Sequence, residues 1–520
     1  MAEKLTQLHP EIALFITTCV VMVLGLMQRA LFRTSCALIS GVGLAIAAWL
    51  SLESPRVEGA IFPGILPYTK TLIALVALLL LPVFAGLMDR DLDASAQKTG
   101  RFDALRAVRG EFYAFFLFSV TGVMLCASAD DMIWLFLALE LTSLPTYVMV
   151  AASSKRMRAQ EAGVKYFFLG AFGAAMFLYG FALLYGATGT TELAGITSSI
   201  RANGGDLGAI GNAGMLLAIV GISFKIAAVP MHAYAADVYQ GAASPVSAYL
   251  AFAPKAAGFI SLMTLIGAVG WDTGTTSETI RLALWVMAVL TMVVGNVLAL
   301  LQTSVKRILA YSSIAHSGYM LVGLIVGPGI LGQTATNGLA AMLFYLAVYG
   351  VSSVGTFAVI ACLQKDAGSG EVVEAESIDD LKGLCATHPV LGWSFVVCVL
   401  SLLGFPPLLG FFGKLALFGA AIHAGEIMLV VILGLNSAVA AWYYLRMAAA
   451  ALIDTRPSTM YAPSYNRIGW RAGAAFVSAL CAIVLVFFIT PLQSGSDEAT
   501  RENVTLASDE PANAPLSMRD

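Results

Sequence analysis

Charged side chains are scarce in this sequence of 520 residues, and their scarcity sets the class of protein. Only 12% of the residues are Asp, Glu, Lys or Arg, against about 25% in soluble domains. Hydrophobic residues make up 59% of the chain, and the mean hydropathy is +0.83. Too few polar side chains remain to cover a water-soluble globule. The composition therefore predicts a polytopic membrane protein.

Several kinds of functional site are missing from the sequence. No CxxC or CxxxC pattern joins the seven cysteines, which excludes a cysteine-based metal cluster and a disulfide framework. The net charge of -3 and the pI near 6.0 provide no basic surface for nucleic acid. No flavin, haem, iron–sulfur or nicotinamide motif is present, since the run GVGLAI at Gly41 lies inside an apolar span.

Apolar runs long enough to cross about 30 Å of hydrocarbon as helices recur along the chain. About fourteen are predicted, near 12–28, 36–52, 68–88, 112–128, 131–152, 161–187, 211–236, 244–269, 281–302, 305–327, 337–363, 389–421, 426–450 and 470–491. The first run precedes Arg29 and Arg33, which is the wrong charge order for a cleaved signal. The predicted fold class is therefore an all-α polytopic membrane protein.

The distribution of lysine and arginine predicts the orientation, because cytoplasmic loops carry the excess. With both termini on the outer side, seventeen of the 29 basic residues fall on inner loops, seven on the outer side and five inside spans. The predicted units are 1–111 with a basic cytoplasmic loop, 112–269, 281–450, the last helix at 451–491 and a polar tail without fixed structure at 492–520. The acidic linker between Lys365 and Lys382 does not indicate catalysis.

A lysine and a proline interrupt the apolar segment SFKIAAVPMH, which begins at Ser223. Lys225 lies roughly 20 Å from the opening of its span at about 1.5 Å per residue. A charge at that depth costs on the order of 2.5–3.5 kcal/mol. Pro230 has no N–H for the carbonyl of Ile226 and is expected to break the helix, and such open backbone needs protein or water around it. The pattern indicates a proton or ion path.

Glu140, in DMIWLFLALELTSLP, is the acidic residue that we expect near mid-membrane. A buried carboxylate requires a cation, which makes Glu140 a candidate partner of Lys225. Alternatively, it is a structural counter-ion or is simply protonated. Pro145 leaves the carbonyl of Leu141 without a donor and is expected to loosen the helix.

Three further basic residues lie inside predicted spans at different depths. Lys255 follows Pro254, which we expect to free the carbonyl of Leu250 and to repeat the geometry at Lys225. Lys165 lies only a few residues inside the cytoplasmic end, where its stem reaches water, so a purely structural role stays open. Arg446 is close to an inner end and is always charged, which indicates an anchor.

Lys414, in GFPPLLGFFGK, is a second lysine attached to an expected helix break, here at Pro406 and Pro407. The two broken segments are the seventh and the twelfth. If segments four to eight and nine to thirteen are repeats, both breaks fall on the fourth member of a unit, and five helices per unit give the units opposite orientations. This pattern is typical of an inverted-repeat transporter.

Two histidines lie away from the segment ends. His316, in VKRILAYSSIAHSGYMLVG, is mid-span between the two expected breaks and is able to relay a proton, or alternatively is a histidine bonded to a neighbouring helix. His232 lies beside the first break, and the same two roles, proton relay or structural histidine, are open for it.

Three runs together carry a family resemblance: KIAAVPMHAYAADVYQGAASPVSAYLAFAPKAAGF, VKRILAYSSIAHSGYMLVG and LLGFPPLLGFFGK. They resemble the antiporter-like membrane subunits of proton-pumping NADH:quinone oxidoreductase, respiratory complex I, over about Phe112 to Arg446. Lys414 stands where subunit M has a glutamate, and the long lateral helix of subunit L is not seen. Among these subunits, the resemblance is therefore strongest to subunit N.

The resemblance implies fourteen helices, two inverted five-helix repeats and a proton path in this chain. Glu140 would be the partner carboxylate, Lys225 the pair lysine, Lys255 the central relay and Lys414 the terminal lysine. Lys165 matches the lysine of the sixth segment that is typical of subunit N. NADH, FMN, iron–sulfur clusters and quinone would belong to other subunits, and this chain would bind no cofactor.

The resemblance also implies a location in the bacterial inner membrane, with periplasmic termini and other complex I membrane subunits, including antiporter-like ones, as partners. A subunit of a multisubunit sodium/proton antiporter is the first alternative. A sodium site requires several hard oxygen ligands at mid-membrane, where we expect only Glu140. A purely structural membrane subunit is the second alternative, which the prolines beside intramembrane charges disfavour.

Overall fold

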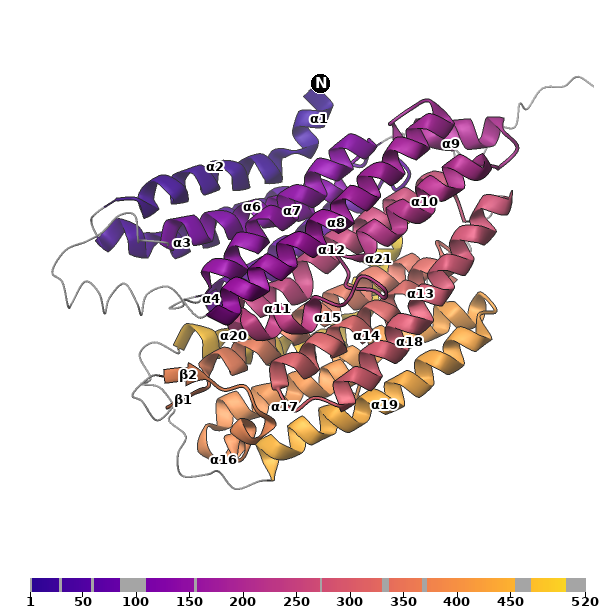
Figure 1. The fold of residues 1–520 in the computed structure, drawn as a ribbon. Coiled ribbons are helices and arrows are strands. Elements are labelled where there is room, and N and C mark those ends of the chain that lie inside the picture. The colour runs from indigo at the N-terminus through magenta and orange to yellow at the C-terminus, as the bar shows by residue number, and fades with distance from the viewer. Residues whose placement is uncertain are drawn as a thin grey trace, which may run out of the picture.

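The computed structural model describes residues 2–27, 30–57, 60–84, 109–153, 157–271, 274–329, 336–366, 372–453 and 469–501. The described chain is a bundle of long helices that run side by side (Figure 1). Eleven of these helices are long and apolar enough to cross a membrane, and four shorter apolar helices accompany them. The predicted class, an all-α polytopic membrane protein, is confirmed, whereas the count of fourteen spans stays a prediction.

The helices follow the predicted spans closely in chain order. The N-terminal group comprises α1 (Ala2–Gln7), α2 (His9–Gly25), α3 (Ala30–Leu52) and α4 (Ile65–Phe84). The next group comprises α6 (Arg109–Ala127), α7 (Met132–Ala152), α8 (Met157–Thr188), α9 (Leu193–Ala202), α10 (Gly208–Ser223), α11 (Ala235–Gly241) and α12 (Ser244–Val269).

The second half of the chain adds a small hairpin to the helices. This half of the chain comprises α13 (Gly274–Leu300), α14 (Val305–Val326), α15 (Gly338–Cys362), β1 (Gln364–Asp366), β2 (Val372–Glu374), η3 (Ile378–Leu381), α16 (Leu384–Thr387), α17 (Pro389–Leu403), α18 (Leu409–His423) and α19 (Ile427–Leu452). The C-terminal group is α20 (Gly469–Val484), η4 (Leu485–Phe488) and α21 (Ile489–Ala499). Strands β1 and β2 pair antiparallel, with Lys365 opposite Val373.

The centre of the bundle is formed by α12, α14 and α15. These helices are apolar on all sides, and every residue of α12 is buried. Helix α19, by contrast, buries only about a third of its most apolar stretch, and Met428, Leu435 and Trp442 project from it. A helix that is apolar all round is stable only inside a protein or a membrane. The exposed apolar faces therefore require lipid or other membrane proteins around them.

Both predicted helix breaks are present. The residues between α10 and α11 form turns, and Lys225 lies just beyond the C-cap residue Phe224. Between α17 and α18, Gly404 caps the first helix at φ +86°, a conformation that favours glycine. Helix α17 starts at the end of the bundle where α11 finishes, so the two broken helices run in opposite directions. Inverted repeats require this arrangement, although the equivalence of the two units stays a prediction.

Two expectations about local structure are wrong. Helix α12 continues through Pro254, so the broken geometry at Lys225 is not repeated there. Helix α7 also continues through Pro145, where only a loosening was expected. One missing hydrogen bond is tolerated in a helix that neighbouring helices enclose. The tail also does not begin at Leu492, because α21 continues to Ala499 and buries Asp497 against other helices.

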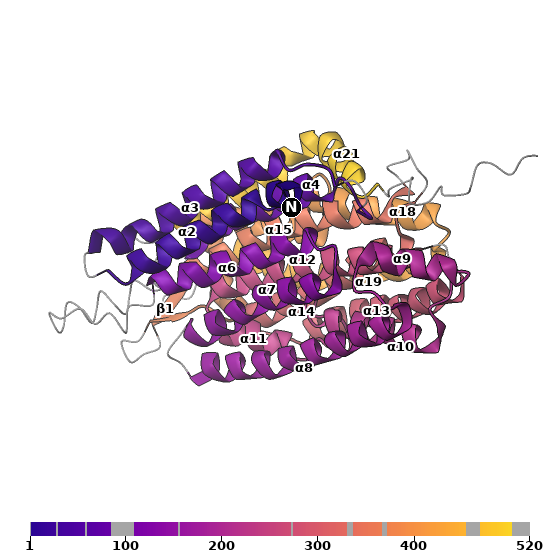
Figure 2. The same ribbon diagram turned by 90° about the horizontal axis from the view of Figure 1, so that it is seen from above.

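The two ends of the bundle differ. Strands β1 and β2 and the short α16 lie at one end, here called the hairpin end, and α9 lies at the opposite end (Figures 1 and 2). The sequence had placed no helix in the connection that forms α9. The linker after β2 is bonded to the start of α14, since Val305 N–H donates to the carbonyl of Glu376 and Ile378 N–H to that of Thr303. The hairpin end is the end that we predict to be cytoplasmic.

Candidate functional site

The first predicted pair, Glu140 and Lys225, is in contact. The Lys225 ammonium lies 3.2 Å from Glu140 Oε1 and also donates to the hydroxyl of Ser143. Glu140 and Ser143 are three residues apart on α7 and therefore share a face of that helix. The lysine side chain is 1% exposed and the glutamate side chain 18%. The rings of Phe177 and Phe224 lie 5.8 Å from the ammonium, so its surroundings are otherwise apolar.

Lys255 is bound to the backbone that the first helix break exposes. Its ammonium donates to the carbonyl of Ile226 at 2.9 Å, to the carbonyl of Ser313 at 2.9 Å and to the hydroxyl of Ser317 at 2.5 Å. The Ser317 hydroxyl in turn donates to the same Ile226 carbonyl at 2.6 Å. Ile226 directly follows Lys225 in the chain, so the break joins the surroundings of the two lysines. All three partners of Lys255 are neutral oxygen atoms.

His316 lies on α14 between the two serines that contact Lys255. Its Nδ1 is 2.6 Å from the hydroxyl of Tyr345 on α15, and its Nε2 is 2.8 Å from the hydroxyl of Tyr444 on α19. The histidine is 1% exposed, and both ring nitrogens are bonded. These bonds to neighbouring helices fit a structural histidine, and the tyrosine hydroxyls also provide the neighbours that a proton relay requires. A relay role for His316 stays a hypothesis.

Lys414 repeats at the second break what Lys255 does at the first. Its ammonium donates to the carbonyl of Leu403, the last residue of α17, at 2.7 Å. A Cβ atom at Gly404 would lie 2.9 Å from Lys414 Cδ, so the glycine makes room for the lysine stem. The ring of Tyr319 lies 5.1 Å from the ammonium, and its centroid is 5.5 Å from that of His316. Tyr319 therefore lies between the histidine and the terminal lysine.

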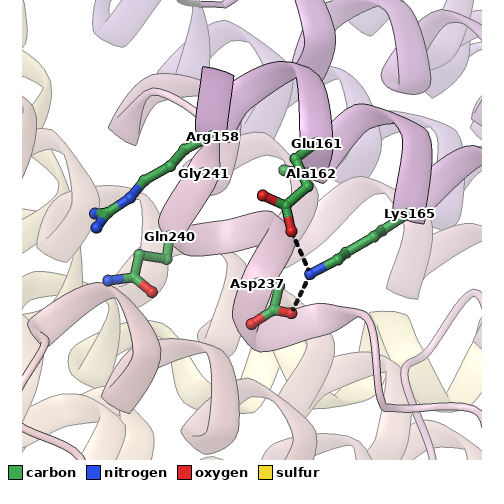
Figure 3. A pocket seen from close by; sticks show the side chains of 7 residues that line it. All are labelled: Arg158, Glu161, Ala162, Lys165, Asp237, Gln240 and Gly241. Atoms are coloured by element: carbon green, nitrogen blue, oxygen red, sulfur yellow. Dashed lines mark hydrogen bonds and ion pairs between the residues drawn. The ribbon is translucent and has the colours of Figure 1, made fainter. Parts of the chain in front are cut away.

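Lys165 lies apart from the buried lysines, at the surface of the hairpin end. It contacts Glu161 at 2.8 Å and Asp237 of α11 at 3.1 Å, and its side chain is 44% exposed (Figure 3). Asp237 also pairs with Arg307 of α14 at 2.8 Å. Lys165, Glu161 and Asp237 border a cavity of about 200 Å³, which is also lined by Arg158, Ala162, Gln240 and Gly241 (Figure 3). A cavity lined by charges at this place admits water to the end of the bundle.

The predicted prolines and the second histidine lie within the breaks. Pro230, Pro406 and Pro407 are exposed on the surface of the described chain. His232 is half-buried, and its Nδ1 makes no hydrogen bond to a described residue. No contact joins His232 to the buried lysines in the part of the chain that the structure describes, so the structure does not bring it into their line.

Sequence reasoning missed the hydroxyl groups that accompany the lysines. The hydroxyls of Ser143 and Ser317 each accept a hydrogen bond from a lysine, whereas Ser313 contacts Lys255 through its backbone carbonyl and its hydroxyl accepts a hydrogen bond from Tyr349 at 2.7 Å. A signal was available, because Ser313 and Ser317 are four residues apart and so share a face of one apolar helix. Asp237 was also missed, since it lies just beyond the predicted end of its span.

Three basic residues near the ends of predicted spans are buried. Lys70 is 0% exposed and lies 2.6 Å from Glu11, and Lys306 is 2% exposed and lies 2.5 Å from Glu374. Arg471 is buried and donates to two backbone carbonyls, which belong to the last turns of α4 and α15. These residues lie close to predicted span ends, where counting charges does not reveal which side chains turn inward.

The described residues place buried ammonium groups against a carboxylate, backbone carbonyls and hydroxyl groups inside the bundle. Each of these groups accepts or donates a proton or a hydrogen bond. The fold and these buried charges together are features of one class of membrane protein.

The comparison with protein families identifies that class. The family described as "NADH:quinone oxidoreductase/Mrp antiporter, TM" matches residues 129–440. NADH-quinone oxidoreductase subunit N of Rhodospirillum rubrum is 35% identical over 513 residues, which cover 96% of this chain and 97% of the relative. The subunit N of Myxococcus xanthus is 39% identical over 416 residues, covering 76% and 79%. The chain therefore belongs to the antiporter-like family and, within it, to the NADH-quinone oxidoreductase subunit N group.

Solved structures agree with this assignment. A chain of respiratory complex I from Thermus thermophilus with bound aureothin matches with a TM-score of 0.74 and 30% identity over 93% of this chain and 98% of that chain. A chain of the Mrp complex from Dietzia matches with a TM-score of 0.74 at 20% identity, over 96% and 97% of the two chains. The second match concerns the fold alone.

Proposed function

We propose that this chain translocates protons as a membrane subunit of an NADH:quinone oxidoreductase. In this proposal the path runs from Glu140 and Lys225 to Lys255, then past His316 to Lys414, and quinone reduction elsewhere in the complex drives it. The observation that carries the proposal is the bond from Lys255 to the carbonyl of Ile226, which the first helix break leaves open. Unpaired backbone at membrane depth requires such a partner or water, so break and lysine act together.

The energies involved are of the size that proton pumping needs. Moving one proton against about 180 mV costs about 4 kcal/mol, at about 2.3 kcal/mol per 100 mV. Separating the partners of a buried ion pair costs about 3–5 kcal/mol, because an uncompensated charge is left in an apolar place. A shift of Glu140 relative to Lys225 would therefore change the cost of the lysine's charge by enough to drive one step. Because the groups interact, their titrations are coupled.

Lys165 takes part at the edge of this path. It is exposed to water beside a cavity that α8 and α11 line at the hairpin end, and Asp237 links it to Arg307 of α14. A charge at this position attracts or repels protons near the predicted cytoplasmic surface but does not carry them through the bundle. We therefore assign Lys165 a weaker role than the buried lysines.

The redox chemistry is assigned to other subunits. FMN, iron–sulfur clusters, NADH and quinone would bind there, and this chain supplies proton translocation. Its partners are other membrane subunits of the complex, including neighbouring antiporter-like ones, which the exposed apolar face of α19 would contact. The chain would lie in the bacterial inner membrane with both termini periplasmic.

The proposal is tested by replacing the central lysine in the assembled complex. Lys255→Ala should abolish most proton pumping in inverted membrane vesicles and lower NADH oxidation, measured with a pH-sensitive dye and by NADH absorbance. Ser261→Ala, a buried position on the same helix, is the matched control and should behave as the wild type. Wild-type pumping in Lys255→Ala would refute the path, and proton movement that requires sodium but no NADH would favour an antiporter.

A further inference from the structure

A partly buried carboxylate, with its side chain 21% exposed, joins three elements at the hairpin end. Glu374, the last residue of β2, accepts hydrogen bonds from the backbone N–H of Ser244 at 3.2 Å and from its hydroxyl at 2.8 Å. Glu374 also pairs with Lys306 at 2.5 Å. Lys306 donates a second hydrogen bond, at 3.0 Å, to the carbonyl of Ala242, the C-cap residue of α11. The side chain of Glu374 therefore ties the start of α12 to the start of α14.

The backbone around Glu374 is held as well. The linker that follows β2 is bonded to the start of α14 through Val305 N–H and the carbonyl of Glu376, at 2.7 Å. The bonds to α14 thus fix the position of Glu374, and the hydrogen bonds of its carboxylate hold the start of α12 in a fixed position relative to α14. A carboxylate suits the first turn of α12, because the helix N-terminus presents unpaired N–H groups and partial positive charge.

The same two helices meet again deeper in the bundle, in matching register. Lys255 follows Ser244 by eleven residues, and Ser317 follows Lys306 by eleven residues. Eleven residues make about three helical turns and span about 16 Å, so each pair lies on one face of its helix. At the starts of the two helices, Glu374 bridges Ser244 and Lys306. Three turns further into the bundle, Lys255 donates directly to Ser317.

We propose that Glu374 is a positioning residue for proton translocation, which sets the axial register of α12 and α14 so that Lys255 meets Ser313 and Ser317. The inference rests on the proposed function. A slip of one residue would move Lys255 by about 1.5 Å along the axis and rotate it by roughly 100°, away from both serines.

The charge state of Glu374 agrees with this role. Burial raises the pKa of Glu374, but the ion pair with Lys306 and the hydrogen bonds from Ser244 outweigh burial and leave the pKa below its ordinary value. The carboxylate is therefore ionised at neutral pH, as its ion pair with Lys306 and its hydrogen bonds from Ser244 require.

The test compares two glutamates of the same linker in the purified, assembled complex. Glu374→Gln should make amide hydrogen exchange at the first turn of α12 roughly tenfold faster, since a hydrogen bond to a charged group is lost. It should also lower the number of protons pumped per NADH oxidised. Glu374→Asp keeps the charge and should restore part of both. Glu376→Gln is the control, because the replacement leaves the backbone bonds of Glu376 in place and changes a side chain whose ion pair is a loose one, 3.9 Å from exposed Arg158. It should change neither quantity.

A double replacement separates positioning from simple stability. Glu374→Leu with Lys306→Met exchanges a buried ion pair for apolar side chains of similar size, a change that proteins tolerate in stability. The double variant should assemble, yet pump fewer protons per NADH and exchange rapidly at the start of α12. Wild-type pumping by this variant, or equal exchange in Glu374→Gln and Glu376→Gln, would overturn the inference. If Lys255→Ala pumps normally, the proposed function fails, while the exchange measurement still reports whether Glu374 ties the helices.

Discussion

Replacing Glu140 with glutamine removes the carboxylate that lies 3.2 Å from the Lys225 ammonium. At an effective dielectric constant of about 20, two unit charges at that distance attract by about 5 kcal/mol. The glutamate side chain is 18% exposed, and Ser143 remains as a partner, so the lower end of the 3–5 kcal/mol range for breaking a buried pair is appropriate. About 3 kcal/mol corresponds to roughly a hundredfold change in an equilibrium constant.

The consequence for transport is a large loss in Glu140→Gln and a partial loss in Glu140→Asp, which keeps the charge on a shorter stem. Because the two groups act as one unit, Glu140→Gln combined with Lys225→Met should cost much less than the sum of the single replacements. Proton pumping and NADH oxidation, measured in inverted vesicles for the four members of this cycle, provide the coupling energy.

Strict additivity across that cycle would refute the reasoning, because it would mean that the two residues never act as a pair. Full pumping by Glu140→Gln would refute it more directly. Immunoblots of the neighbouring subunits in each membrane preparation serve as the control, since a variant that fails to assemble loses both activities for another reason.

The remaining predictions concern depth, orientation and pH. Lys165→Ala should weaken pumping mildly and Lys225→Ala strongly, because only the second removes a buried charge; the reverse order would contradict the depth argument. A reporter fused after Arg519 should score as periplasmic and one at Gly370 as cytoplasmic, and both on one side would exclude the predicted topology. The pKa of Glu374 is lowered from its ordinary value of 4.5 despite burial, so its stabilising contribution is complete above about that pH and is lost as the pH falls through the lowered value. The difference in melting temperature between wild type and Glu374→Gln should therefore be constant near neutral pH and shrink in acid.

The two breaks were predictable because their causes are local. Pro230 and the pair at Pro406 remove hydrogen bonds inside apolar segments, and the structure interrupts its helices there. Pro254 has the same local chemistry, yet α12 continues through it because neighbouring helices enclose that helix on every side. A proline therefore indicates where a helix is weakened, and the surrounding packing decides whether the helix breaks.

The sequence by itself determined the class of protein, and it predicts the spans and the depth of Glu140, Lys225 and Lys255, because hydropathy and helical rise act along the chain. Only the tertiary structure decided the partners of these groups. The carbonyl of Ile226 and Lys255 are 29 residues apart, and Glu374 reaches Ser244 across 130 residues. The physical reason is that membrane depth follows from position along one helix, whereas the neighbour that a buried charge meets depends on how helices pack sideways. That packing is set by many weak apolar contacts that no local pattern records.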